Sequence, residues 1–250
     1  MRKLCSIGVL SVFFILLLAG NGLALPTLYE ALSNDNGVPG VDVDSLKNYY
    51  DTGAEAVSLT DTDGTIDSAI ASLLFEFAGF KDTNTFGIYG FTENDGAVAI
   101  NPNGMLEVFN GASNEGSSRK INFNVGTGEA YLGTDADNSK AIGTTFGFYM
   151  KTTEGVEHTY YSHTSLNDDG FNHALIYDTS KLSIDDSLAL TMADVVVAFE
   201  DLYGGGDQDW NDMTVGISDV APVPEPATML LLGTGLIGLA GMSRKKMFRK

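Results

Sequence analysis

The sequence predicts an all-β protein, a β-sandwich with jelly-roll-like topology, flanked by an apolar segment near each end. Short apolar runs recur at intervals of about ten residues through the middle of the chain, which is typical of sandwiches. Glycine, asparagine, aspartate and threonine gather between these runs, where turns require them. Ile121, Phe123 and Val125 alternate with Asn122 and Asn124, as in a strand with one buried face.

Residues 1–24 have the layout of a secretory signal peptide. Arg2 and Lys3 precede a continuous apolar run, and small residues lead up to Ala24, after which we expect cleavage. Cys5, the single cysteine of the chain, lies in this segment. We therefore expect the mature protein to have no disulfide and no thiol chemistry.

Residues 25–70 are expected to form the N-terminal segment of the mature domain, with short helices at Leu28–Leu32 and Val43–Tyr50. The acidic run Asp61–Asp67 begins like the calcium-binding loop of an EF-hand. However, its glycine stands at the fourth position instead of the sixth, and Ser72 takes the place of the glutamate at the twelfth. A plain turn is therefore favoured over a second calcium site.

Residues 71–220 are expected to form the sandwich itself. Its predicted strands are Ala71–Phe80, Thr85–Thr92, Met105–Asn110, Lys120–Val125, Thr144–Lys151, Thr159–Ser162, His173–Asp178, Asp194–Asp201 and Met213–Ser218. Within these, Val195–Phe199 is continuously apolar, which indicates a buried central strand. Turn residues between the strands stand at Asn94–Gly96, Asn101–Gly104, Gly126–Gly128 and Asp168–Gly170.

The charge of the mature region excludes one class of partner. Residues 25–226 keep all 33 acidic residues but only seven of the 14 basic ones, which gives a net charge of −26. Such a charge repels phosphate backbones and anionic lipid surfaces. We therefore expect no nucleic acid partner.

The last thirty residues have three parts. Residues 221–226 read as a short hinge with a Pro-Glu-Pro motif, and residues 227–243 as a transmembrane helix. Sixteen apolar residues give a helix of about 24 Å, which is short for a hydrocarbon core of about 30 Å, but flanking basic side chains can extend its reach. Residues 244–250 form a basic tail expected on the cytoplasmic side. Its basic residues are Arg244, Lys245, Lys246, Arg249 and Lys250.

This arrangement resembles the PEP-CTERM sorting domain of Gram-negative bacteria. The resemblance rests on the motif Pro224, Glu225 and Pro226, the short glycine-bearing span and the basic end, in that order. It implies recognition by an exosortase, a membrane-embedded cysteine protease, with cleavage near the motif. It also implies transient anchoring in the inner membrane, followed by release to the cell surface or exopolysaccharide matrix. The alternative is an ordinary tail anchor.

The segment Val197–Val215, which reads VAFEDLYGGGDQDWNDMTV, is the most informative part of the domain. Its crowded carboxylates repel one another unless a cation lies between them, and a hard divalent ion with oxygen ligands, calcium above all, would relieve that repulsion. Three glycines allow the backbone to turn carbonyl groups inward. We expect Trp210 to cover the site or to pack under it. The predicted ligands are Glu200, Asp201, Asp207, Asp209, Asn211 and Asp212.

Two other interpretations of this segment stay open. It is a solvated acidic turn that serves only folding, or it contains a catalytic carboxylate pair, since paired acids can perform general acid–base chemistry. Several acids on one short loop are more typical of a ligand cage than of two groups that face each other across a cleft.

The same segment resembles an uncharacterised bacterial domain family with the signature F-E-D-x-x-G-G-G-D-x-D-[FWY]-N-D, found in PEP-CTERM proteins and calcium-dependent adhesins. A second family element, S-x-x-x-L-N-x-D-G-x-x-H, corresponds to Ser162–His173. The family implies a β-sandwich and calcium binding, with sugar or surface binding as a looser inference and no established reaction. His173 and Trp210 are candidates to contact a ligand. The alternative for His173 is a structural role, in which it forms a hydrogen bond with the neighbouring turn. His158 and His163 are expected at the surface.

Together these features predict an exported, non-enzymatic protein that binds calcium and acts as a structural or adhesive component of exopolysaccharide or biofilm. A first alternative is a carbohydrate-binding module, in which exposed aromatic rings stack on sugars. Its candidate residues are Tyr160, Tyr161, Tyr203 and Trp210. A second alternative is a glycosidase, which needs two carboxylates roughly 5–9.5 Å apart across a cleft.

Overall fold

The structure is a computed structural model of the chain that describes residues 25–33, 43–75, 83–152, 156–182, 192–224 and 234. The predicted signal peptide lies outside these ranges, as do Glu225, Pro226, the basic tail and, apart from Thr234, the predicted membrane helix. Within the described ranges, no helix combines the length and the apolar character that crossing a bilayer would need.

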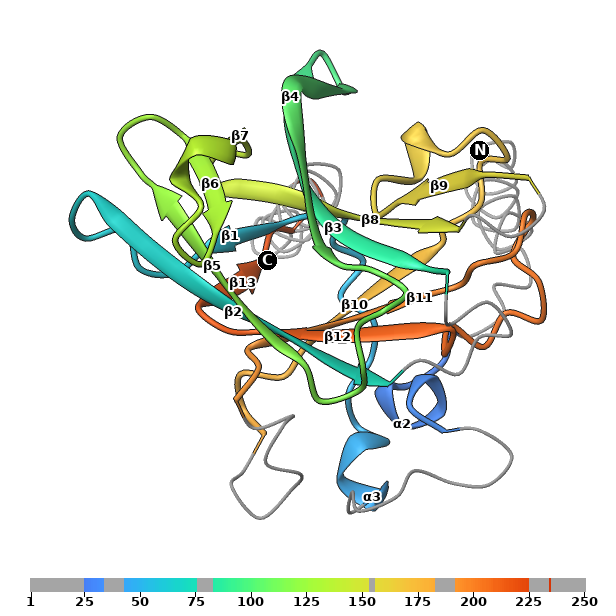
Figure 1. Cartoon of the computed structure of the whole chain (residues 1–250). Helices are drawn as coiled ribbons and strands as arrows, with labels where there is room; N and C mark the ends of the chain where they lie inside the picture. Colours follow the sequence, from blue (N-terminus) through green and yellow to red (C-terminus); the bar gives the residue numbers. More distant parts are fainter. Residues whose placement is uncertain are drawn as a thin grey trace, which may run out of the picture.

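Two antiparallel sheets form the domain (Figure 1). In the first, the strand order is β13-β1-β8-β3-β4, and β9 also pairs with β8. Its strands are β1 (Val57–Leu59), β3 (Thr85–Asn94), β4 (Ala97–Phe109), β8 (Thr145–Thr152), β9 (His158–Tyr161) and β13 (Val220–Pro222).

The second sheet has the order β10-β11-β12-β2-β5-β6-β7. Its strands are β2 (Ile66–Phe75), β5 (Ser118–Asn124), β6 (Glu129–Leu132), β7 (Lys140–Ala141), β10 (Ala174–Asp178), β11 (Val195–Phe199) and β12 (Met213–Ile217). Four short helical segments complete the described chain: α2 (Leu28–Ala31), α3 (Val43–Leu46), η1 (Ala136–Asn138) and η2 (Thr164–Leu166). The chain crosses repeatedly between the sheets, for example from β1 to β2 and from β12 to β13.

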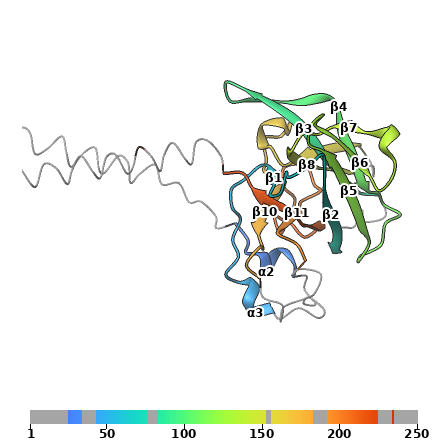
Figure 2. The ribbon, with the colours of Figure 1, turned by 90° about the vertical axis from the view of Figure 1, so that its left-hand side faces the viewer.

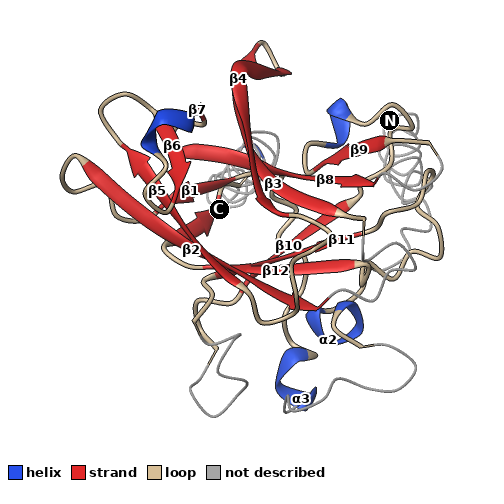
Figure 3. Ribbon diagram, in the orientation of Figure 1, coloured by secondary structure: helices blue, strands red, loops and turns tan. Residues whose placement is uncertain are grey.

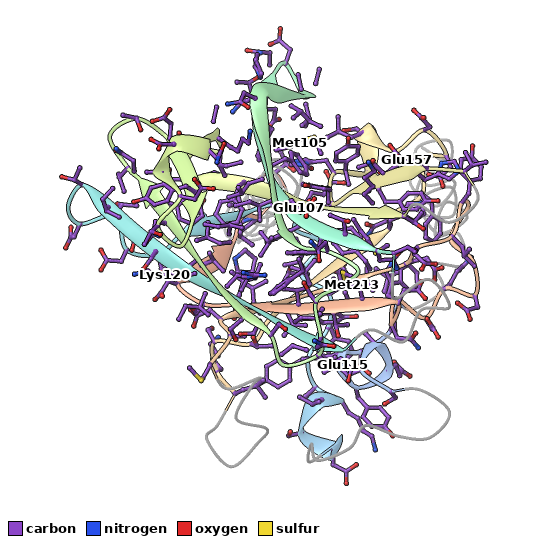
Figure 4. The ribbon with its side chains drawn as sticks, viewed as in Figure 1. Met105, Glu107, Glu115, Lys120, Glu157 and Met213 are labelled. Carbon is purple, nitrogen blue, oxygen red and sulfur yellow. The ribbon has the colours of Figure 1, made fainter. Side chains whose placement is uncertain are left out.

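The main core lies between the two sheets. Phe86 of β3 packs against Phe148 of β8 and, edge to face, against Phe199 of the opposite sheet, with ring centroids 5.9 Å and 6.1 Å away. Met213, the first residue of β12, is buried in the same core and lies between the sheets in Figure 4. Burial of these large apolar side chains from both sheets is what holds the layers together. The prediction of an all-β fold is confirmed.

A second apolar cluster covers the outer face of β10 and β11. Leu28 of α2 and Leu46 of α3 are fully buried there, together with Val196 and Ala198 of β11. Helices α2 and α3 lie on the side of the second sheet that faces away from the first (Figures 2 and 3). Helix α2 begins with a capping box, in which Thr27 and Glu30 satisfy each other's backbone N–H groups. Because both faces of β11 are covered, all five of its residues are buried, as the apolar run predicted.

Some pairings in the structure were not predicted. Strand β13 pairs with β1, and the N–H of Val223 donates to the carbonyl of Ala56, so residues 221–223 of the expected hinge belong to the sheet. The expected turn Asn101–Gly104 instead lies inside β4. There Gly90 of β3 faces these four residues, because the paired register jumps between Ile100 and Met105. The segment is a bulge in a continuous strand.

Candidate metal centre

The acidic loop, residues 200–212, joins the neighbouring antiparallel strands β11 and β12. Glu200 follows the last residue of β11 and Asp212 precedes the first residue of β12, so the ladder brings the two ends of the loop together. Five of the six predicted ligands are carboxylates, and the fold gathers them into two overlapping groups. The groups are Glu200, Asp207 and Asp209, and Glu200, Asp201 and Asp212. Within each group, one oxygen from every carboxylate lies within 4.8 Å of the others.

Glu200 belongs to both groups and is completely buried, at 0% exposure. Its Oε2 accepts a hydrogen bond from the backbone N–H of Gln208 at 3.2 Å. Among the residues that the structure describes, its Oε1 has no hydrogen-bond partner. A buried carboxylate oxygen without a donor is costly, and natural proteins rarely leave one. Glu200 Oε1 is therefore a candidate ligand for a cation.

Asp201 and Asp212 form the more enclosed side of the loop. Asp212 Oδ2 accepts the N–H of Asp201 at 2.8 Å. Asp201 Oδ2 accepts a hydrogen bond from Nδ2 of Asn84 at 3.0 Å. Asn84 is fully buried, and its Oδ1 has no hydrogen-bond partner within the described ranges. Asn84 could not be predicted as part of the site, because it stands 117 positions before Asp201 and just ahead of β3.

Burial and mutual repulsion raise the pKa values of acids in this loop. Burial, with the nearby charge of Asp207, raises the pKa of Glu200 to about 7. Burial, with the charge of Asp201, raises the pKa of Asp212 to about 8. Among the described residues, no lysine or arginine forms a salt bridge with any of the five carboxylates. Without a cation, the site therefore tends to take up protons at neutral pH.

Three glycines make the loop possible. Gly204, Gly205 and Gly206 all have positive φ angles, of +75°, +85° and +40°. A Cβ atom on Gly206 would lie 2.3 Å from Glu200 Oε1, and one on Gly205 would lie 2.1 Å from Cζ of Phe171. The glycines thus meet a conformational requirement and a steric one, since the loop is pressed onto the carboxylate that it encloses.

The upstream element Ser162–His173 braces this loop. Asp169 Oδ2 accepts the N–H of Gly204 at 2.8 Å and lies 2.9 Å from Nε2 of His173, while its Oδ1 accepts the N–H of Phe171 at 3.0 Å. Burial raises the pKa of Asp169, but these hydrogen bonds outweigh burial and lower it to about 2. Asp169 is thus a fixed anion that holds the glycine turn.

The three histidines occupy different settings. His173 is fully buried; its Nδ1 donates to the carbonyl of Glu200 at 2.9 Å, and its ring stacks on Tyr160 at 3.8 Å. Its contacts are thus those of a residue that supports the neighbouring turn. His158 is partly exposed. The expectation for His163 is wrong: it is 6% exposed, and its Nδ1 is hydrogen-bonded to the hydroxyl of Tyr89.

Trp210 and Asn211 face the body of the protein. Trp210 is 4% exposed and belongs to the outer apolar cluster, where it donates from Nε1 to the carbonyl of Asn172 and stacks on Phe171. It therefore packs under the loop, one of the two expected positions. Nδ2 of Asn211 donates to Oδ2 of Asp209. It also donates to the carbonyl of Ser33, at 3.4 Å. Asn211 thus joins the loop to the end of α2.

The run Asp61–Asp67 contributes to neither carboxylate group among the described residues. Asp61 Oδ1 accepts the N–H of Asp63 at 2.9 Å, the closed ring of an Asx-turn, and Gly64 has a φ of +108°. These are the features of the plain turn that the sequence favoured.

Beside the acidic loop lies a pocket of about 310 Å³. Tyr203, a loop residue that is 61% exposed, forms one side, and Tyr160 and Tyr161 of β9 form another. Asp168 and Glu157 add carboxylates; Glu157, which pairs with Lys151, lies at the edge of the molecule in Figure 4. Three of the four aromatic residues predicted for a sugar site thus line one pocket, whereas Trp210 does not.

Two family models match parts of the chain. A family described as a domain of unknown function, DUF4114, matches residues 100–219, which include the acidic loop and its brace. The PEP-CTERM protein-sorting motif matches residues 222–245. The chain carries a PEP-CTERM sorting motif. This motif implies export, processing by exosortase and a membrane-anchoring sorting signal at the C-terminal end. No curated protein and no solved structure matches the chain.

Proposed function

We propose that this PEP-CTERM protein is a calcium-binding structural or adhesive component of the cell surface or extracellular matrix. One observation carries the metal proposal: Glu200 is buried among four other carboxylates with Oε1 unpaired. The predicted donors are oxygens, which suits a hard ion such as calcium better than zinc or copper. The sorting motif supports the location outside the inner membrane. Release to the surface and a role in biofilm are part of the proposal.

We propose further that the protein is not an enzyme. A glycosidase requires two carboxylates that face each other across a substrate cleft, at roughly 5–9.5 Å. The five acids here lie on one loop, in groups that span no more than 4.8 Å, and the central one is buried. This arrangement favours an ion over a sugar between the carboxylates.

The test uses the exported, processed protein. Its melting temperature is measured in millimolar calcium, in the same concentration of magnesium, and in a chelator. Because an ion that binds only the folded state stabilises it, calcium should raise the melting temperature by several degrees, and magnesium by less. Equal melting temperatures in calcium and chelator, with no heat on calorimetric titration, would contradict calcium binding.

A second candidate function, carbohydrate binding, is favoured by the pocket at Tyr203. An exposed aromatic ring next to carboxylates is a suitable platform for a sugar, since the ring stacks on its apolar face and the carboxylates accept from its hydroxyl groups. Glycan-array binding that is lost in Tyr203→Ala and kept in Tyr50→Ala, an equally exposed tyrosine outside the pocket, would support it. Equal binding by both variants would count against this pocket.

A further inference from the structure

We infer that the acidic loop binds two divalent cations, an outer and an inner one, bridged by the carboxylate of Glu200. The inference rests on the proposed calcium binding and gives its stoichiometry and geometry. The outer site consists of Glu200, Asp207 and Asp209, and the inner site of Glu200, Asp201 and Asp212.

The distances argue for two sites instead of one. Oxygens bound to one calcium ion at about 2.3–2.6 Å lie at most about 5 Å from each other. Among the described residues, the carboxylates that meet such a limit form two groups of three, and no group contains all five. A single ion would therefore bind only three of these acids in this arrangement and leave the other two close together without a cation.

Glu200 has the properties of a bridging ligand. It is the only member common to both groups, and its two oxygens have different surroundings. Oε2 accepts from Gln208, which stands between Asp207 and Asp209 of the outer site, while Oε1 has no partner. A carboxylate with two oxygens can bind one cation with each. This explains why the unpaired oxygen belongs to the residue that the two groups share.

A second observation supports the inner site. Asn84 holds Asp201 through Nδ2, and its Oδ1 is buried without a hydrogen-bond partner. Asn84 Oδ1 is thus a neutral oxygen on a side chain that bonds directly to a member of the inner group. Amide oxygens are ordinary calcium ligands. Both Asn84 Oδ1 and Glu200 Oε1 are buried without a partner in the described part of the chain, and such atoms are rare in native proteins.

Charge leads to the same conclusion. Five ionised carboxylates carry five negative charges, and one divalent ion would leave three of them uncompensated in a site where Glu200 and Asp201 are buried. Two ions leave one. Because uncompensated buried charge is costly, the second ion should bind at concentrations near those that fill the first.

The two sites should differ in hydration. Asp207 is exposed and Asp209 partly exposed, so the outer ion would complete its shell with water. Asp201 is 4% exposed, and Asn84 and Glu200 are fully buried, so the inner ion would keep fewer water molecules. Terbium, which replaces calcium and reports bound water through its luminescence lifetime, should show two lifetimes in the wild-type protein.

The decisive measurement is stoichiometry, by native mass spectrometry and calorimetric titration of the processed protein with calcium. We expect two ions per wild-type chain, and one ion each in Asp207→Asn, which removes an outer ligand, and Asp212→Asn, which removes an inner one. Asp137→Asn, an exposed acid outside the loop, should keep two. The surviving terbium lifetime should be the more hydrated one in Asp212→Asn and the less hydrated one in Asp207→Asn.

The outcomes separate this inference from the proposed function. One ion per wild-type chain, with a single terbium lifetime, would overturn the bridged pair and leave calcium binding intact. No bound ion would overturn both. The wild-type measurements need no substitution, so they decide the matter even if a variant fails to fold.

Discussion

The carboxylate of Asp169 accepts a hydrogen bond from the backbone N–H of Gly204 at 2.8 Å, across 35 positions of sequence. This contact joins the two elements of the chain that resemble one family, Ser162–His173 and the acidic loop. It makes Asp169 a positioning residue: its own oxygens are occupied by protein donors, and its effect on an ion would pass through the shape of the loop.

The first prediction concerns Asp169→Asn. The amide keeps the size of the side chain but loses the charge that holds Gly204 and His173, so the loop should be less well ordered. We expect calcium affinity to fall about tenfold, the lower range for loss of an outer-shell partner. Calorimetric titration measures it. Asp168→Asn, its exposed neighbour, should bind as the wild type does, and an equal loss in both would refute the brace.

The second prediction compares two glycines of the loop. Gly206→Ala places a Cβ atom against Glu200 Oε1, whereas Gly204→Ala meets nothing within 4 Å. Both positions have positive φ, so both variants carry backbone strain of order 1 kcal/mol. Only Gly206→Ala should also displace Glu200, and it should lose most calcium binding. Similar affinities in the two variants would show that the steric contact is unimportant.

The third prediction is a pH dependence of the metal-free protein. Glu200 and Asp212 have pKa values raised to about 7 and about 8, against about 4 in an unfolded chain. Between these limits the folded state holds more protons than the unfolded state, so stability falls as pH rises. In chelator, the melting temperature should decrease from pH 5.5 to 8.5.

Calcium should change that profile. The ion binds the deprotonated carboxylates, so its stabilising effect grows as pH rises through the same window. Asp169, with a pKa of about 2, contributes stability that is lost only as pH falls well below 4, so it does not disturb the comparison. If the melting temperature of the metal-free protein rises from pH 5.5 to 8.5, the prediction that folding raises the pKa values of Glu200 and Asp212 is wrong.

The fourth prediction uses the only tryptophan of the chain. Trp210 lies within the acidic loop and is buried against Phe171, so its fluorescence reports on this loop alone. We expect weak quenching by acrylamide in calcium and stronger quenching in chelator, because the repelling acids loosen the loop. Quenching that is identical in both conditions would show that the loop keeps its form without the ion.

The features that could be predicted from sequence depend on nearby residues. The turn at Asn94–Gly96 forms as expected, with φ of +52° at Asp95 and +80° at Gly96, since only the local backbone decides it. The apolar run of β11 identified a buried strand for the same reason. The acids of the loop stand close together in sequence, so their proximity needed no knowledge of the fold.

What could not be predicted depends on partners far along the chain. Asn84 bonds to Asp201, 117 positions away in the sequence. Buried His163 is hydrogen-bonded to Tyr89, which is 74 positions away. The motif at Asn101–Gly104 has the residues of a turn, yet pairing on both sides converts it into a bulge. The division of the acids into two groups likewise depends on how the glycines fold the loop back over Glu200.

The pairing of β13 with β1 has a consequence for maturation. Among the described residues, Val223 makes the last backbone hydrogen bond of the sheet, and in the sequence a single proline separates it from Glu225 of the sorting motif. A cut at that point would detach the membrane tail and leave every strand in place. The folded body can therefore be complete before it is released.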